Sequence, residues 1–499
     1  MSTFALWRLF HRPGTRGLSG HTSLLATVAF AAATGIFLTV LGGVHGFVWR
    51  ASADHTVACF LDARRCAPGA DAVAYWAQTF PDAALADGGT SLADNMAGMA
   101  GGYVFLAAVA CLLLVVPFAA LAGSAARLAA SRRDARLAAL RLVGATRGQV
   151  VRLTALDAAG QAVLGALIGV LLYLALMPAI MLLNFQNLHF TFEQLWVGPL
   201  ALVATVAGVA ALALASALLT LRRVSITPLG VAARASQPLP AAWRVAAFVG
   251  AMIAALATFK LLPQLGASLG EAAMIAISLG FMLLPFLLMN LVGSWAVAAR
   301  ARARARRPRT AAVMIGMRRI LDDPKRAWRN VSGIALAMFI AGFTSVAGYA
   351  GTGGGAPADA AAATDPAVIF ARDIGTGGLL TLAFAAVLAA VSSGVMQAGS
   401  VYDQADEYRM LVLEGTDVAT LARARFAEVM TPLNVVTLLA GGCSMLLMLP
   451  LFGQAMGAAS TLLGFLGGVG LCYALVAVGA FAANRAAASL SLVDRRTDD

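Results

Sequence analysis

The sequence predicts an all-α polytopic membrane protein with ten transmembrane helices and both termini in the cytoplasm. Three observations predict this class: 12% of the residues are charged, 60% are hydrophobic, and long charge-free runs recur along the chain. Soluble domains carry about 25% charged residues, and a helix needs roughly 20 apolar residues to cross the hydrocarbon core. We expect the ten helices to form two four-helix repeats joined by a helix pair.

The charge-free runs give the crossings in order. Eight of them lack Asp, Glu, Lys and Arg entirely, and a ninth is broken only by Lys260. The last run has 56 residues, or roughly 84 Å as a helix, so we expect it to hold two crossings with a turn at Pro450–Gly457. The runs are 17–49, 95–126, 158–192, 194–221, 245–270, 272–299, 330–358, 374–402 and 429–484.

The charges between these runs predict the orientation. With cytoplasmic termini, the cytoplasmic segments carry 31 of the 36 Lys and Arg, while the external segments carry 5 basic and 11 acidic residues. Basic residues concentrate on the cytoplasmic side of membrane proteins, and the opposite orientation would reverse this pattern. The net charge of +12 is therefore mainly a topology signal, with attraction to membrane lipid as a secondary interpretation. It does not predict binding of nucleic acid.

The residues that form enzyme sites do not occur in recognisable patterns. The chain has no Gly-Lys-Ser/Thr loop, no HExxH and no CxxC, and its five histidines are scattered. We expect no catalytic residues, no metal site and no cofactor, and we expect that the chain does not hydrolyse ATP itself. The largest external loop, 50–100, holds Cys59 and Cys66. These form either a disulfide, which oxidising compartments permit, or two free thiols.

A basic, amphipathic stretch, Arg132–Arg152, lies between the second and third predicted crossings. Leu137, Leu140 and Val143 share one helical face by their spacing. Gly144 is typical of a helix stop, and Thr146 is a candidate N-cap for the next helix. We expect a short helix, a bend and a second helix that enters the membrane, or alternatively an ordinary positive loop. We call this stretch the first coupling segment.

A diverged copy of this stretch, the second coupling segment, lies at Asp406–Arg425. Aligning Gly144 with Gly415 also pairs Leu140 with Leu411, Leu142 with Leu413, Arg152 with Arg423 and Asp157 with Glu428. Crossings 1–4 therefore repeat as crossings 7–10, with crossings 5 and 6 inserted between them. An interfacial helix, the elbow 314–329, is expected before crossing 7. The predicted segments are 1–221 (first repeat), 222–299 (linker pair), 300–485 (second repeat) and 486–499 (tail).

Small residues recur four apart within the runs, as at Gly165 and Gly169. Such pairs let membrane helices approach closely. We assign them to helix packing and not to a substrate site.

The stretch LAALRLVGATRGQVVRLTALDAAGQAVLGALIGVLLY resembles the signature of the FtsX-like permease family. The residues that carry the resemblance are Leu140, Arg141, Gly144, Ala145, Thr146, Gln149, Asp157, Gly165 and Gly169. The second copy keeps Leu411, Gly415, Thr416 and Glu428. The resemblance implies a chain with two FtsX-like domains, similar to permease subunits of MacB, FtsX and BceB type. This chain departs from those relatives because it lacks their large external domain.

The resemblance also implies partners. In that family a separate cytoplasmic ABC ATPase dimer binds the permease through coupling helices, in a bacterial plasma membrane. The implied ATPase-coupling residues are Arg136, Leu137, Leu140, Arg141, Val143, Gly144, Thr146, Leu411, Leu413, Gly415 and Thr416. The implied function is export or force transmission, and the substrate class is a hydrophobic compound, a lipid or a peptide.

Several alternatives remain at this point. Asp157 and Glu428 are expected near the membrane edge. Three roles are open for them: pairing with Arg152 and Arg423, binding of the elbow helix, or stabilisation by the helix dipole as acids at a helix start. The whole chain could instead be a stand-alone secondary transporter. The near absence of ionisable residues deep in the runs counts against a carrier. A membrane signalling partner that transports nothing is a variant of the permease prediction.

Overall fold

The computed structural model describes residues 19–51, 101–112, 147–186, 188–225, 242–265, 271–351, 366–403, 410–452 and 459–491, with single helical residues between 113 and 121. Within these ranges the chain is helical except for short connections and one two-stranded hairpin. It divides into two compact units, unit 1 (Met1–Arg222 and Ala347–Thr381) and unit 2 (Arg223–Val346 and Leu382–Asp499).

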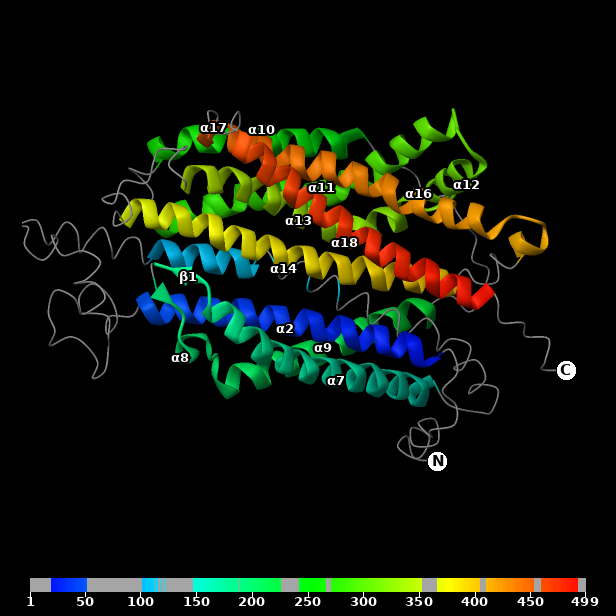
Figure 1. Cartoon of the computed structure of the whole chain (residues 1–499), viewed down its shortest axis with the longest axis horizontal. Coiled ribbons are helices and arrows are strands. Elements are labelled where there is room, and N and C mark those ends of the chain that lie inside the picture. The colour runs from blue at the N-terminus through cyan, green and yellow to red at the C-terminus, as the bar shows by residue number, and fades with distance from the viewer. Residues whose placement is uncertain are drawn as a thin grey trace, which may run out of the picture. The chain divides into compact units, whose positions relative to one another are not determined.

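Unit 1 is built on two long helices that pack against each other, α2 (Ser19–Ala51) and α7 (Arg147–Met181) (Figure 1). A hairpin follows α7, with β1 (Asn184–Phe185) paired antiparallel to β2 (Leu188–His189). The single-turn helix α8 (Phe192–Leu195) then packs on α2 and α7. Its N-cap Thr191 and Gln194 form a capping box, which satisfies donors at the start of the turn. Helix α9 (Gly198–Ser225) completes this part of the unit.

Glycines set how closely α2 and α7 approach. A Cβ on Gly165 would lie 2.8 Å from the carbonyl oxygen of Thr27, and one on Gly169 would lie 2.6 Å from Cβ of Thr34. Gly35 faces the same seam, where a Cβ would lie 3.1 Å from the carbonyl oxygen of Gly169. Only residues without a side chain permit this spacing. The packing role predicted for Gly165 and Gly169 is confirmed.

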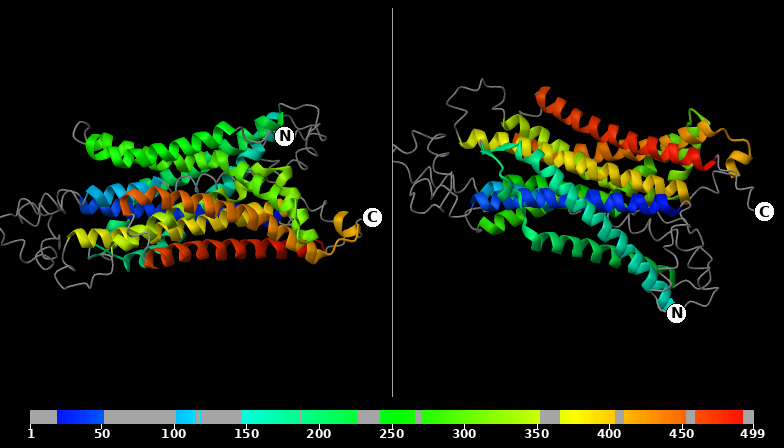
Figure 2. Two further views of the ribbon diagram at one scale, coloured as in Figure 1. Left: turned by 90° about the horizontal axis from the view of Figure 1, so that it is seen from above. Right: turned by 60° about the horizontal axis from the view of Figure 1, so that its bottom comes forward.

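Unit 2 holds most of the remaining helices. Helices α13 and α14 have one end each in unit 1. Figure 2 shows the last helix, α18, as one uninterrupted red ribbon. The bounds are α10 (Ala242–Leu265), α11 (Glu271–Ala305), α12 (Ala311–Asp322), α13 (Pro324–Gly351), α14 (Pro366–Asp403), α16 (Val418–Val436), the π-helix η4 (Thr437–Gly441), α17 (Gly442–Phe452) and α18 (Ala459–Ser491).

Helix α13 supplies the centre of unit 2. Every residue from Ile334 to Ala341 is buried, so the helix is enclosed on all sides, as a uniformly apolar helix requires. Two glycine contacts bring neighbours close: a Cβ on Gly342 would overlap the Ser444 side chain, and one on Gly468 would lie 2.8 Å from Cβ of Ala341. Helices α17 and α18 therefore pack directly on α13.

The described residues contain six helical segments that are long and apolar enough to cross a membrane. They lie at the predicted crossings 1, 3, 4, 8, 9 and 10. Helices also occupy the positions of the other four, at 101–112 and in α10, α11 and α13. A multi-pass membrane protein is thus supported, and ten crossings with their orientation stay a prediction. The six segments are Leu24–Ala51, Ala158–Met181, Phe192–Ser216, Ile369–Gln397, Val418–Leu449 and Thr461–Gly479.

Candidate functional site

The second coupling segment is described from Met410 onward, and it contains a helix stop followed by a new helix. One helical turn ends at Leu413, and Gly415 then adopts a left-handed backbone with φ +91°. The N–H of Gly415 donates to the carbonyl of Val412 at 3.0 Å, and that of Thr416 donates to the carbonyl of Leu411 at 2.9 Å. This pair of bonds is the Schellman motif, which glycine accommodates without strain. Helix α16 starts directly afterwards, with Asp417 as its N-cap residue.

This segment leaves apolar side chains uncovered. Leu413 is 84% exposed and Met410 is 65% exposed, although both lie next to a polar turn at the start of a long helix. Val412, which lies between them, is exposed as well. Single exposed apolar residues are ordinary, but several along one short segment indicate a contact surface. Glu414 and Asp417, both exposed, add acidic groups to it.

Helix α16, which carries this segment, is held firmly by the corner between α11 and α12. Gly316 of α12 lies against α16, where a Cβ would come within 2.7 Å of the carbonyl oxygen of Ala424. Arg304 at the end of α11 donates to Oγ1 of Thr431 at 3.0 Å. The Thr431 hydroxyl donates in turn to Sδ of Met317 at 3.8 Å. A force on the segment would therefore reach α11 and α12 through α16.

The chain continues from α16 through η4 into α17 without a break, from Val418 to Phe452. The π-helical turn at Thr437–Gly441 interrupts the regular α-helical ladder, and such turns occur often at functional positions. Beside it, Tyr473 of α18 donates to Oδ1 of Asn434 at 2.5 Å. The Thr437 hydroxyl donates to the Tyr473 oxygen at 3.4 Å. These bonds tie α16 and η4 to α18.

The other predicted residues are placed only in part. Arg136 to Thr146 of the first coupling segment, and Cys59 and Cys66, lie outside the described residues. Asp157 lies in α7, which begins at Arg147, directly after the predicted N-cap position. Glu428 lies in α16 with a half-buried side chain. The alternatives for these two acids stay predictions. Within the described ranges, no group of three His, Cys, Asp or Glu could hold a metal ion.

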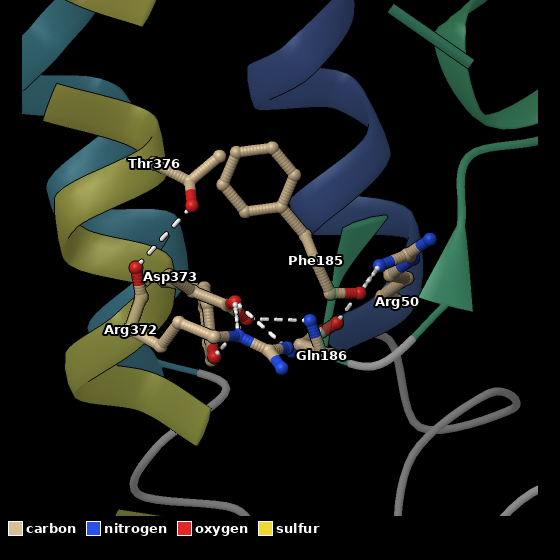
Figure 3. Close-up of polar contacts among 7 residues, drawn as sticks. Arg50, Phe185, Gln186, Arg372, Asp373 and Thr376 are labelled. Carbon is tan, nitrogen blue, oxygen red and sulfur yellow. Dashed lines mark hydrogen bonds and ion pairs between the residues drawn. The ribbon is translucent and has the colours of Figure 1, made fainter. Parts of the chain in front are cut away.

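A second polar site, which the sequence did not predict, surrounds the hairpin of unit 1 (Figure 3). Arg50, in the last turn of α2, is buried. Its guanidinium donates to the backbone carbonyls of Phe185 at 2.9 Å and His189 at 3.0 Å, one on each strand. It also donates to Oε1 of Gln194 at 3.2 Å and lies 4.2 Å from the ring centroid of Phe190. One cation therefore fixes both strands and α8.

Asp373 of α14 holds the same hairpin by its turn (Figure 3). It is 2% exposed, and its Oδ2 accepts from the Tyr103 hydroxyl at 2.8 Å and from the Gln186 N–H at 2.5 Å. Gln186 has φ +59°, a left-handed conformation that a glutamine rarely adopts. The bond to Asp373 holds the turn residue in that conformation. Arg372 donates to the second carboxylate oxygen at 3.3 Å.

These residues gave little signal in the sequence. Arg50 directly follows the charge-free run 17–49, and Asp373 directly precedes the run 374–402, so the sequence pattern of each is that of a charge at a membrane boundary. Gln186 lies inside the charge-free run 158–192, and a hairpin is not expected within a run that is predicted to be one membrane-crossing helix. The available signal was the cluster of Asn, Gln and His at 184–189 within an otherwise apolar run.

Comparison with known families yields one match. Residues 104–229 match the FtsX-like permease C-terminal domain, which covers about a quarter of the chain. The matched region includes the first coupling segment, α7, the hairpin and α9. One domain of this family is detected, and the sequence resemblance had implied two. Domains of this kind are typical of non-catalytic membrane subunits of ABC transporters. No curated protein and no solved structure matches the chain.

Proposed function

We propose that the chain is the permease subunit of an ABC transporter. It would couple ATP hydrolysis by a separate cytoplasmic ABC ATPase dimer to export or to force transmission across a bacterial plasma membrane. The observation that carries the proposal is the FtsX-like match over residues 104–229, because it spans the first coupling segment and the helix that follows it. The sequence supplies no phosphate-binding Gly-Lys-Ser/Thr loop of its own.

A second FtsX-like domain at 300–485 is part of the proposal. Its support is the alignment of Gly415 with Gly144, together with the helix stop and restart found around Gly415. Because the first copy has the same glycine two residues before Thr146, we expect the same turn there. Two coupling segments on one chain would place one contact on each subunit of an ATPase dimer.

The two contacts are expected to differ in charge. The first segment carries six basic residues and one acidic residue, Asp134, whereas the second carries four acidic and three basic residues. An acidic ATPase surface would therefore be attracted more strongly to the first segment than to the second at long range. In this mechanism, ATP binding closes the ATPase pair and draws both segments together. The four-helix halves then rock against each other.

The substrate class is what the resemblance to FtsX-like permeases implies. Long apolar faces on α7 and α9 are exposed in the chain, as at Leu171 and Leu200, and they would face lipid. We propose a hydrophobic or amphipathic compound, a lipid or a peptide as the transported molecule. A relative that only transmits force to an external partner is the variant of the same proposal.

The first test is co-purification with a candidate ABC ATPase that is co-expressed with this chain. Leu140→Asp combined with Val143→Asp places two charges on the predicted apolar face of the first coupling segment. We expect the ATPase to be lost from the purified complex, because an unpaired buried carboxylate is costly at an interface. Leu182→Asp is the matched control, since Leu182 is 78% exposed and follows the opposite end of α7. Full co-purification of the double variant would overturn the docking claim.

A further inference from the structure

We propose that the connection from α11 to α13 is a docking site for the headgroups of anionic phospholipids. Eight basic side chains are exposed from residue 300 to residue 330, against two exposed acidic ones, Asp322 and Asp323. We call these eight residues the basic corner: Arg300, Arg302, Arg306, Arg307, Arg309, Arg318, Lys325 and Arg329.

The position of the basic corner matches the level of lipid headgroups. The charge-free run 272–299 lies immediately before it, and the run 330–358 lies immediately after it. Helix α11 thus ends, and α13 begins, where an apolar helix would leave and re-enter the hydrocarbon core. Helix α12, which connects them, is 12 residues long, or roughly 18 Å. The exposed cations are therefore held beside the surface of the bilayer.

The two faces of α12 explain why the occupant would be lipid. Ala312, Gly316 and Ile320 recur every four residues on the buried face, which packs on α11 and α16. The opposite face presents Met314, which is 43% exposed, one turn before the exposed Arg318. An apolar side chain next to a cation is the pattern of a helix that lies at the boundary between acyl chains and headgroups.

The site is already formed before any lipid binds. Arg304 donates to Thr431, and Trp328 of α13 donates from Nε1 to Oδ1 of Asn290 at 3.2 Å. The Trp328 ring lies directly over Gly293 of α11, where a Cβ would overlap it. Both ends of the connection are thus fixed to α11 or α16. The backbone of the basic corner loses little conformational entropy when lipid binds, because these contacts already hold it in place.

The test uses the full chain in nanodiscs that contain phosphatidylcholine and phosphatidylglycerol in equal amounts, with bound lipid counted by native mass spectrometry. The corner variant is Arg306→Gln/Arg307→Gln/Arg309→Gln. The matched control, Arg485→Gln/Arg495→Gln/Arg496→Gln, removes the same charge elsewhere on the predicted cytoplasmic side. We expect the preference for phosphatidylglycerol to fall at least about five-fold in the corner variant, the effect of roughly one basic residue near an anionic surface. The control should stay near wild type.

Three outcomes would overturn the proposal. An equal loss in both variants would mean a diffuse attraction without a site, and no loss in the corner variant would mean no lipid contact there. Loss of the ATPase with lipid preference retained would assign the corner to a protein partner. Arg318→Gln, a single exposed side chain, serves as the second variant if the triple variant does not fold. It should weaken the preference in the same direction, and thermal unfolding in phosphatidylcholine alone verifies the fold.

Discussion

The second coupling segment and the hairpin of unit 1 are both short connections beside long apolar helices. They differ in which groups are buried and which are exposed. The hairpin buries Arg50 and Asp373 and pairs both with backbone groups. The coupling segment satisfies its backbone with the Gly415 turn but leaves Leu413 and Met410 exposed. One connection is complete within the chain, and the other has apolar surface left to bury.

This difference separates a structural role from a docking role. Polar groups at the hairpin are buried where an unpaired partner would be costly, so changes there should act on stability. Changes to exposed residues of the coupling segment should act on partner binding and leave the fold intact.

The largest loss of stability is expected for Arg50→Met. The substitution keeps a long side chain but leaves the carbonyls of Phe185 and His189 without their buried donor. Two unsatisfied acceptors cost about 1–3 kcal/mol each, so we expect a loss of roughly 3 kcal/mol. Thermal unfolding of the purified chain in detergent measures it. Arg372→Met, which changes a neighbouring and half-exposed arginine, is the control. If both variants melt alike, the hairpin is not the stabilising site.

A smaller loss is expected where α12 supports α16. Gly316→Ala places a Cβ 2.7 Å from the Ala424 carbonyl oxygen, so the two helices must separate. Overpacking of this kind costs about 1–3 kcal/mol. Gly442→Ala is the control, because its Cβ would meet nothing within 4 Å. Thermal unfolding should rank Gly316→Ala below Gly442→Ala, and the reverse order would contradict the close packing of α12 on α16.

The smallest effect is expected for Gly415→Ala. At φ +91° an alanine is strained by about 1–2 kcal/mol, but the turn is exposed and can relax locally. We expect a small change in melting temperature together with faster hydrogen exchange at Thr416, whose N–H closes the turn. Gly415→Asn should lie between alanine and wild type, since asparagine tolerates the left-handed region. Identical exchange in all three would show that the turn does not depend on glycine.

The sequence predicted the class of fold well, because charged residues are excluded from the segments that cross the bilayer, and the charge-free runs therefore mark those segments. It also aligned Gly415 with Gly144, where a helix stop is predicted, and the structure has a helix stop at Gly415, a conformation that backbone sterics restrict largely to glycine. The close packing at Gly165 and Gly169 was predicted as well. The hairpin was not predictable, because Phe185–Leu188 lacks the Asn-Gly turn and lies inside an apolar run. Its partners Arg50 and Asp373 are 323 positions apart, so no local pattern joins them.

The position of the second coupling segment was predictable from the sequence, but which of its side chains are exposed was not. Alignment with the first segment assigned both Leu411 and Leu413 to the coupling residues, and the structure exposes Leu413 far more than Leu411, which is half-buried. Which of the two leucines is buried depends on contacts with the rest of unit 2, and the sequence pattern of the segment gives no information about those contacts. The first coupling segment lies outside the described residues, so its face stays a prediction from the sequence.

The central claim is tested most directly by measuring two properties of the same two variants, Leu413→Asp and Arg50→Met. The properties are the melting temperature and the amount of ABC ATPase that co-purifies below that temperature. The account predicts that Leu413→Asp loses the ATPase and melts like wild type, since Leu413 is 84% exposed. Arg50→Met should melt earlier and keep the ATPase. Full ATPase binding by Leu413→Asp, with its loss in Arg50→Met, would contradict the account.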